Sequence, residues 1–214
     1  IACDTTNLAK VKKIINQSKT NKIKIGYKFG LEFMNSKNGR TFLAKLRKKI
    51  IFVDLKLNDT VNTMLSAVKA LKDIKINYLT VHISSGLAAL KAVKKISGPT
   101  RIVGVTTLTS LNNNDLKLIG YNKSVKNLVA HQAKLAKKAN LDALVCSPYE
   151  VSAVRKIFKK EIITPGVQIG KKNYDQKRSM EAKKVNSDWL VIGRAITARG
   201  NIKKNIQNLI EKLR

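Results

Sequence analysis

The chain has 214 residues, of which 43% are hydrophobic and 26% are charged. That length and content suit one globular domain, and we expect a single domain over residues 1–214. No apolar run approaches the roughly 20 residues that a transmembrane helix needs. The opening stretch, "IACDTTNLAK", is too polar for a signal peptide, so we expect a cytoplasmic protein with no membrane partner.

The net charge is +30, carried by 35 Lys and only 8 Arg that are spread along the whole chain. A basic nucleic-acid-binding protein is one interpretation. Specific nucleic-acid sites, however, favour Arg forks and stacking aromatic side chains, and only 5% of these residues are aromatic. We therefore expect a lysine-rich surface without a specific nucleic-acid partner, which still attracts anionic substrates.

Eight short apolar runs recur along the chain, each with the length and β-branched content of a strand buried on both faces. We expect strands at 1–4, 23–26, 50–56, 78–83, 101–106, 142–147, 161–166 and 188–193.

Stretches with apolar residues at helical spacing lie between these runs, and the first of them opens with a capping Thr. We expect helices within 5–16, 60–72, 85–96, 124–139 and 201–213. Strands alternating with helices predict a parallel sheet with helices outside. Eight units favour a closed (β/α)8 TIM barrel, although the chain is shorter than the typical ~250 residues. An open doubly wound sheet is the alternative.

The stretch "IIFVDLKLNDT" places charges inside an apolar strand. Because side chains alternate along a strand, Asp54 and Lys56 share a face and point into the barrel mouth. A buried structural ion pair is the simpler interpretation, but such pairs stabilise weakly. Together with Asp59 and Lys24 they predict an alternating array that keeps a lysine protonated and ready to donate a proton to a carbanion.

These residues carry a resemblance. "DLKLNDTVNT" resembles the DxKxxD signature of orotidine 5′-phosphate decarboxylases, in particular the bacterial type. Further segments fall in the order expected for that family, over nearly the whole chain: "IACDT", "IKIGYKFGLEF", "VHISSG", "VTTLTSL", "VCSPYEV", "TPGV", "DQKRSM" and "WLVIGRAIT".

The resemblance implies decarboxylation of orotidine 5′-phosphate to UMP in pyrimidine biosynthesis, with no cofactor and no metal. It implies that Lys56 protonates C6 of the pyrimidine and that Asp54 lies beside the departing carboxylate. Asp59 and Thr63 would reach the site of the neighbouring subunit in a homodimer. The other implied substrate-binding residues are Asp4 and Lys24 for the ribose, Thr109 and Ser110 for the pyrimidine, and Pro165, Gln168, Gln176, Gly193 and Arg194 around the phosphate.

The chain departs from the family pattern at several positions. Asn58, Thr60 and Val61 replace the usual histidine, isoleucine and proline. Gln168 stands where bacterial relatives usually have an arginine, which removes a charged bidentate phosphate contact. We expect a higher KM, with Lys171 or Lys172 supplying charge from the same loop. The 166–176 stretch would be a lid, or else an ordinary surface loop.

The nearest alternatives are Mg²⁺-dependent barrels that also resemble this chain, the 3-keto-gulonate-phosphate decarboxylases and hexulose-phosphate synthases. They hold the metal partly through a glutamate in the second-strand segment, where "IKIG" has Lys24 and no carboxylate. His82 is either near the site or a core histidine. A nucleic-acid-binding barrel is a less favoured alternative.

Overall fold

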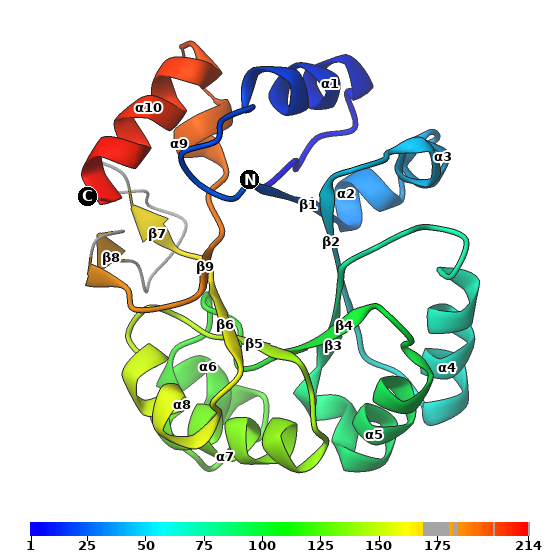
Figure 1. Cartoon of the computed structure of the whole chain (residues 1–214). Helices are drawn as coiled ribbons and strands as arrows, with labels where there is room; N and C mark the ends of the chain where they lie inside the picture. The colour runs from blue at the N-terminus through cyan, green and yellow to red at the C-terminus, as the bar shows by residue number, and fades with distance from the viewer. Residues whose placement is uncertain (169–179, 182–183, 199, 214) are drawn as a thin grey trace.

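The computed structural model describes residues 1–168, 180–181, 184–198 and 200–213. Its main sheet has seven strands, all parallel, which curl around a central axis with helices outside (Figure 1). The strands lie in the order β1 (Gly26–Gly30), β2 (Ile50–Leu57), β3 (Tyr78–His82), β4 (Arg101–Val105), β5 (Ala143–Val145), β6 (Glu161–Thr164) and β9 (Trp189–Leu190). A separate two-stranded pair joins β7 (Val167–Gln168) to β8 (Met180–Glu181).

All five expected helices are present: α1 (Leu8–Gln17), α4 (Val61–Ala70), α5 (Gly86–Ile96), α7 (Val125–Lys138) and α10 (Ile202–Leu213). Each buries one stripe of apolar residues against the sheet, as the spacing predicts. The cap of α1 is Asn7 rather than a Thr, because its side chain accepts the Lys10 N–H. Shorter helices complete the outer layer: α2 (Leu31–Met34), α3 (Gly39–Lys45), α6 (Asn113–Leu118), α8 (Val151–Ile157), α9 (Arg194–Thr197) and the 3₁₀ turn η1 (Ile83–Ser85).

The first three residues run between the two ends of the curled sheet. Lys28 N–H donates to the Ile1 carbonyl at 2.9 Å, and Cys3 N–H donates to the Lys28 carbonyl at 2.8 Å. On the other side, Ala2 N–H donates to the Ile192 carbonyl at 2.8 Å. This segment therefore hydrogen-bonds both to β1 and to the chain that follows β9.

The strand expected at 23–26 is instead β1, at Gly26–Gly30. It pairs with β2 through Tyr27↔Ile51 and Gly30↔Asp54. The sequence repeats one pattern, apolar-Lys-apolar-Gly, in "IKIG" and in "YKFG". The second copy forms the strand because its aromatic residues, Tyr27 and Phe29, are buried in the core between sheet and helices. This register puts Lys28, in the middle of β1, on the inner face of the sheet.

Two apolar layers hold the fold together. The larger lies between the sheet and the helices, where fully buried side chains such as Phe29, Leu79 and Leu90 each contribute about 1.5–3 kcal/mol relative to exposure. The smaller fills the ring of strands and consists of Phe52, Tyr78, Val103, Ala143 and Ile163.

Polar side chains bridge neighbouring strands at their amino ends. Asp142, just before β5, accepts the Ile102 N–H of β4 at 2.8 Å. Asp188, just before β9, accepts the Ile162 N–H of β6 at 2.7 Å, and Asn77, just before β3, accepts the Ile51 N–H of β2 at 2.8 Å. We call these three residues the strand staples.

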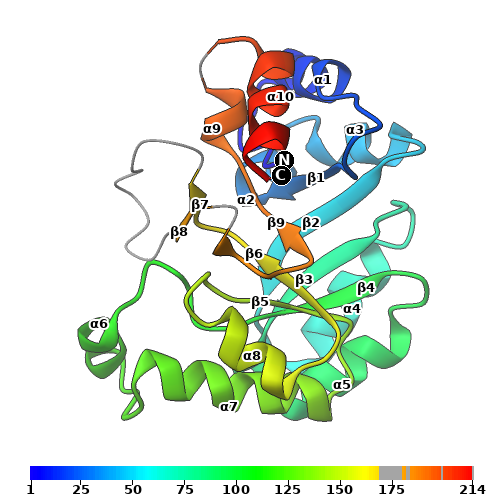
Figure 2. The same ribbon diagram turned by 60° about the vertical axis from the view of Figure 1, so that its left-hand side comes forward.

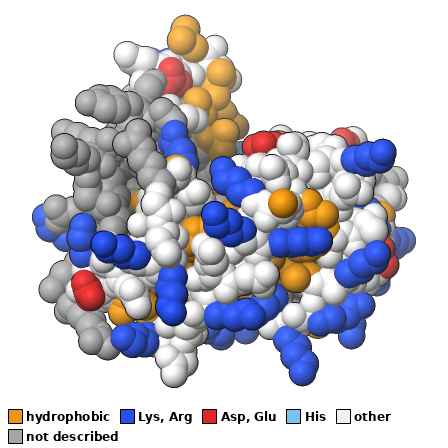
Figure 3. Space-filling model, turned by 90° about the horizontal axis from the view of Figure 1, so that it is seen from above, with side chains coloured by type: hydrophobic (Ala, Val, Ile, Leu, Met, Phe, Trp, Pro, Cys, Tyr) orange, Lys and Arg blue, Asp and Glu red, His pale blue; other side chains and the backbone are white. Residues whose placement is uncertain are grey.

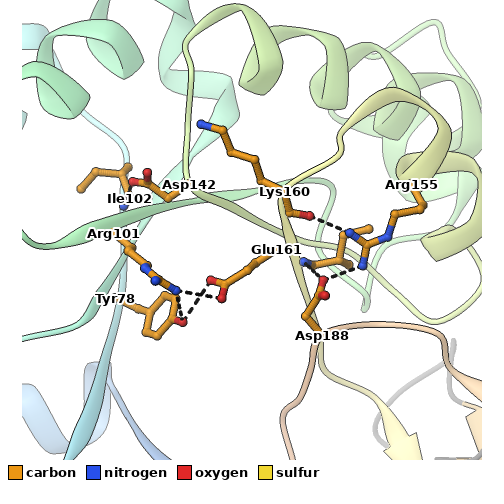
Figure 4. A network of polar contacts seen from close by, with 9 residues as sticks. Tyr78, Arg101, Ile102, Asp142, Arg155, Lys160, Glu161 and Asp188 are labelled. Atoms are coloured by element: carbon orange, nitrogen blue, oxygen red, sulfur yellow. Dashed lines mark hydrogen bonds and ion pairs between the residues drawn. The ribbon is translucent and has the colours of Figure 1, made fainter.

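A second polar cluster lies beside the staples (Figure 4). Arg101 donates to the Tyr78 hydroxyl at 2.9 Å and pairs with Glu161 at 2.8 Å, and Tyr78 donates to Glu161 at 3.0 Å. Side-chain contacts therefore connect the amino ends of the strands, in addition to the backbone hydrogen bonds of the sheet.

The longer connections lie at the carboxyl ends of the strands. Figure 2 shows α6, β7 and β8 on the same side of the molecule. Among the described residues, no helix combines the length and the apolar content that crossing a bilayer requires.

Candidate active site

A cavity of about 310 Å³ opens at the carboxyl ends of the strands. Asp4, Lys28, Asp54 and Lys56 supply its charged wall. The expected residues Thr109, Pro165, Gly193 and Arg194 also line it, together with Phe52 and Gly166. Residues from or next to six of the seven strands therefore line one space, which is where barrel enzymes place their chemistry.

Four charged side chains form a row of alternating sign along the cavity wall. Lys28 Nζ lies 3.1 Å from Asp4 Oδ1 and 3.2 Å from Asp54 Oδ2. Lys56 Nζ lies 2.9 Å from the same Asp54 oxygen. The order is Asp4, Lys28, Asp54, Lys56, and we call this set the charge row.

The inner members of the charge row are the most buried. The side chains of Asp54 and Lys28 are 10% and 14% exposed, whereas those of Lys56 and Asp4 are 34% and 53% exposed. The two end groups are therefore the ones that a ligand in the cavity can reach.

The neighbouring charges favour the ionised forms of the two inner residues, Asp54 and Lys28. Burial alone would raise the pKa of Asp54, but the ammonium groups of Lys28 and Lys56 lower it by more, so its pKa lies below the ordinary value. Burial would lower the pKa of Lys28, but Asp54 and Asp4 outweigh it, so its pKa is raised. Each inner charge is thus stabilised by a neighbour on either side.

The strand that carries Asp54 and Lys56 is irregular at that point. Between β2 and β3, Val53 pairs with Leu79 and Leu57 pairs with Val81, so a four-residue step on β2 faces a two-residue step on β3. Lys56 adopts a positive φ of 50° within this bulge. Both charged side chains reach the cavity as expected, but through a bulge rather than through simple alternation.

The expectation that Lys24 joins the array is wrong, and Lys28 occupies that place. The Lys24 ammonium lies 5.7 Å from the centroid of the Trp189 ring. It lines a larger, mainly apolar cavity of about 500 Å³ at the amino ends of the strands. The four-residue error in the position of β1 accounts for the difference, and the second apolar-Lys-apolar-Gly pattern was the signal that could have found Lys28.

Asp59 precedes α4 and Thr63 lies in its first turn, and both are exposed. The Asp59 carboxylate accepts the Thr60 N–H at 2.6 Å, and the Thr63 hydroxyl lies 3.1 Å from that of Thr60. Within the part of the chain that the structure describes, Asp59 makes no ion pair, and it stands apart from the charge row.

The remaining predicted residues divide into three groups. Ser110 is exposed and lies outside the described lining of the cavity. Gln168 has its backbone in β7, while its side chain lies outside the described residues. Gln176, Lys171 and Lys172, together with most of the expected lid, also lie outside them.

His82 ends β3 and is half-buried close to the charge row. Burial, and then the Lys56 ammonium, lower its pKa, and Asp54 only partly opposes them. The imidazole is therefore neutral at neutral pH. Cys3 and Cys146 are both buried, and burial raises the pKa of the Cys3 thiol to about 12.

Comparisons with known proteins agree on one family. Residues 1–209 match the model of the orotidine 5′-phosphate decarboxylase / HUMPS family. An orotidine 5′-phosphate decarboxylase of Wolbachia pipientis subsp. Culex pipiens is 40% identical over 195 residues, covering 87% of this chain and 86% of the relative. One from Wolbachia sp. subsp. Brugia malayi is 39% identical and covers 99% of this chain and 96% of its own.

A solved structure agrees with the fold and the family. The crystal structure of orotidine 5′-phosphate decarboxylase from Lactobacillus acidophilus superimposes with a TM-score of 0.84 at 27% identity, covering 99% of this chain and 96% of that one. The chain belongs to the orotidine 5′-phosphate decarboxylase / HUMPS family.

Proposed function

We propose that this chain decarboxylates orotidine 5′-phosphate to UMP, the final step of de novo UMP synthesis, without a cofactor. The observation that carries the proposal is the charge row at the cavity wall, with Lys56 at one of its two accessible ends. Family membership and relatives named for this reaction support it.

The reaction needs a proton donor at a difficult carbon. Loss of CO₂ from C6 leaves a carbanion with no adjacent electron sink, and Lys56 supplies the proton to it. Its ammonium attracts the carbanion more strongly than the neutral ring, so its effect favours the transition state. Asp54 holds that ammonium at 2.9 Å and faces the departing carboxylate.

The magnitudes require several contributions. Enzymes lower barriers by about 8–23 kcal/mol, and this reaction belongs near the upper end. One preorganised donor contributes about 3–4 kcal/mol. Repulsion between Asp54 and the substrate carboxylate could add to this, because two like charges 4 Å apart repel by ~4 kcal/mol at an effective dielectric of 20. The ammonium groups of Lys28 and Lys56 reduce that repulsion, because Asp54 is already paired with both. Binding of the distant phosphate supplies part of the remainder.

The cavity accommodates the other parts of the substrate. We assign the ribose hydroxyls to Asp4 and Lys28, with Lys28 in place of the originally expected Lys24. Gly193 and Arg194 follow β9, where barrels bind phosphate. Further predicted contacts are Thr109 and Ser110 for the pyrimidine and Pro165, Gln168 and Gln176 for the phosphate side.

We further infer that residues 1–3 act as the eighth strand of a closed barrel formed by residues 1–214. Their hydrogen bonds to β1 and to Ile192 support this. We infer a cytoplasmic homodimer in which Asp59 and Thr63 complete the partner subunit's site. Both side chains are exposed and do not belong to the charge row of the same subunit, so they are free to contact a partner subunit, which supports this assembly.

A second candidate remains within the same family, the Mg²⁺-dependent decarboxylases and synthases that act on sugar phosphates. They need a carboxylate in the second-strand segment. Lys28, paired with Asp4 and Asp54, stands on the inner face there, which favours the orotidylate reaction.

The test is the ultraviolet absorbance of orotidine 5′-phosphate mixed with purified protein and EDTA. We expect loss of the substrate band with the wild type and a fall of at least about 100-fold with Lys56→Ala, because a preorganised donor contributes at that scale. Equal rates for both proteins would contradict the role of Lys56. No loss with either would contradict the reaction, and the Mg²⁺-dependent sugar phosphates would then be tested.

A further inference from the structure

Thr80 is a buried residue of β3 whose hydroxyl touches both functional groups of the bulge. Its Oγ1 accepts the backbone N–H of Lys56 at 2.8 Å and donates to Asp54 Oδ1 at 3.1 Å. The side chain is 0% exposed and is not part of the cavity lining described above. Thr80 therefore contacts the charged residues of the site but not the cavity itself.

The bulge explains why a side chain is needed at this position. The register shift between Val53 and Leu57 interrupts the regular pairing of β2 with β3, and within it the Lys56 N–H bonds to a side chain of β3 and not to a backbone carbonyl. A buried N–H without an acceptor is costly. The Thr80 hydroxyl supplies the missing acceptor and so supports the positive φ of Lys56, which is uncommon for a residue with a long side chain.

The same hydroxyl also fixes the rotation of the Asp54 carboxylate. Thr80 bonds to Oδ1, whereas Lys28 and Lys56 both pair with Oδ2. Since one oxygen is held by the hydroxyl, the other is aimed at the two ammonium groups.

We infer that Thr80 is a positioning residue for the decarboxylation, holding the Lys56 backbone and the Asp54 carboxylate in their working geometry through one hydroxyl group. The inference rests on the proposed role of Lys56 as proton donor. Thr80 itself touches no substrate, so its effect passes through Lys56 and Asp54 alone.

The test compares Thr80→Val, which keeps the shape and removes the hydroxyl, with Thr80→Ser, which keeps the hydroxyl. Thr106→Val is the matched control, because it removes a buried hydroxyl that donates to the Val145 carbonyl at 2.7 Å on a neighbouring strand and does not touch the charge row. Lys56→Ala is assayed in parallel. For each variant, kcat, the dissociation constant of UMP and the urea midpoint are measured.

We expect kcat of Thr80→Val to fall about 100-fold, the loss that a misplacement of about 1 Å produces, with UMP affinity within about threefold of wild type. Thr80→Ser should recover most of kcat, and Thr106→Val should keep it, even if both valine variants lose similar stability. If Thr80→Val is insoluble, Thr80→Cys replaces it, with an intermediate loss expected from its weaker hydrogen bonds.

Wild-type kcat in Thr80→Val or Thr80→Cys, while Lys56→Ala is inactive, would overturn the positioning role and leave the proposed function intact. A loss in Thr106→Val as large as in Thr80→Val would also overturn it. Full activity of Lys56→Ala would instead refute the proposed mechanism, and the inference with it.

Discussion

Lys28 lies between two carboxylates and is the most constrained cation of the charge row. Its ammonium is within 3.2 Å of both Asp4 and Asp54, and its side chain is largely buried. Lys24, four residues earlier, is exposed beside Trp189 at the other end of the strands. The two lysines lie in the same sequence pattern and carry the same charge. Replacing each in turn therefore shows whether activity depends on the position of the lysine or only on its charge.

We predict that Lys28→Ala lowers kcat/KM at least about 100-fold, because it removes a preorganised cation from beside Asp4 and leaves Asp54 paired with Lys56 alone. Lys24→Ala should stay within about threefold of wild type. Steady-state kinetics with orotidine 5′-phosphate measures both, and urea unfolding checks that each variant is folded. Similar losses in the two variants would contradict the position of β1 in the sheet.

At the scale of elements, the strand and helix alternation was predictable because buried parallel strands read as continuous apolar runs and the helices as stripes. The position of β1 was not, because "IKIG" and "YKFG" satisfy the same pattern and only burial of Tyr27 and Phe29 against the helices decides between them. The bulge at Lys56 was not predictable either, since it depends on pairing with Thr80, 24 residues away.

The strand staples were also missed, because Asn77, Asp142 and Asp188 are ordinary turn residues in the sequence. Each acquires its role from the preceding strand. Burial would raise the pKa of Asp188, but Arg155 and the Ile162 N–H lower it by more. A lowered carboxyl pKa means that this staple contributes fully above the unfolded pKa of about 3.9 and is lost as the pH falls through the lower, folded value.

We predict that Asp142→Ala lowers the free energy of unfolding by about 1–3 kcal/mol, because the buried Ile102 N–H loses its acceptor. Asp142→Asn should lose less, since an amide oxygen still accepts. The matched control is Asp73→Ala, which removes an exposed ion pair with Arg40 and should cost about 0–1 kcal/mol. Urea denaturation measures all three, and equal losses for Asp142→Ala and Asp73→Ala would contradict the staple.

At the scale of the whole molecule, the charge of +30 is a surface property. Figure 3 shows Lys and Arg side chains distributed over the face seen from above, with few acidic ones among them. Such a field attracts an anionic nucleotide, but it also makes two copies repel each other. The homodimer proposed above would have to form against this repulsion, which salt screens over ~8 Å at physiological ionic strength.

We predict that the protein is a dimer whose dissociation constant rises as ionic strength falls, measurable by analytical ultracentrifugation at low and physiological salt. Mixing inactive Lys56→Ala with Asp59→Ala should restore about a quarter of wild-type activity, because half of the dimers are mixed and each holds one intact site. Asp59→Ala that remains fully active, or a mixture that stays inactive although the dimers exchange subunits, would contradict a shared site.

Stability and the proposed chemistry depend on opposite ends of the strands. The strand staples and the cluster of Tyr78, Arg101 and Glu161 lie at the amino ends of the strands. The charge row and the cavity lie at their carboxyl ends. Mutations at the carboxyl edge can therefore accumulate without loosening the framework. This separation lets the catalytic residues change while the residues that hold the strands together stay the same.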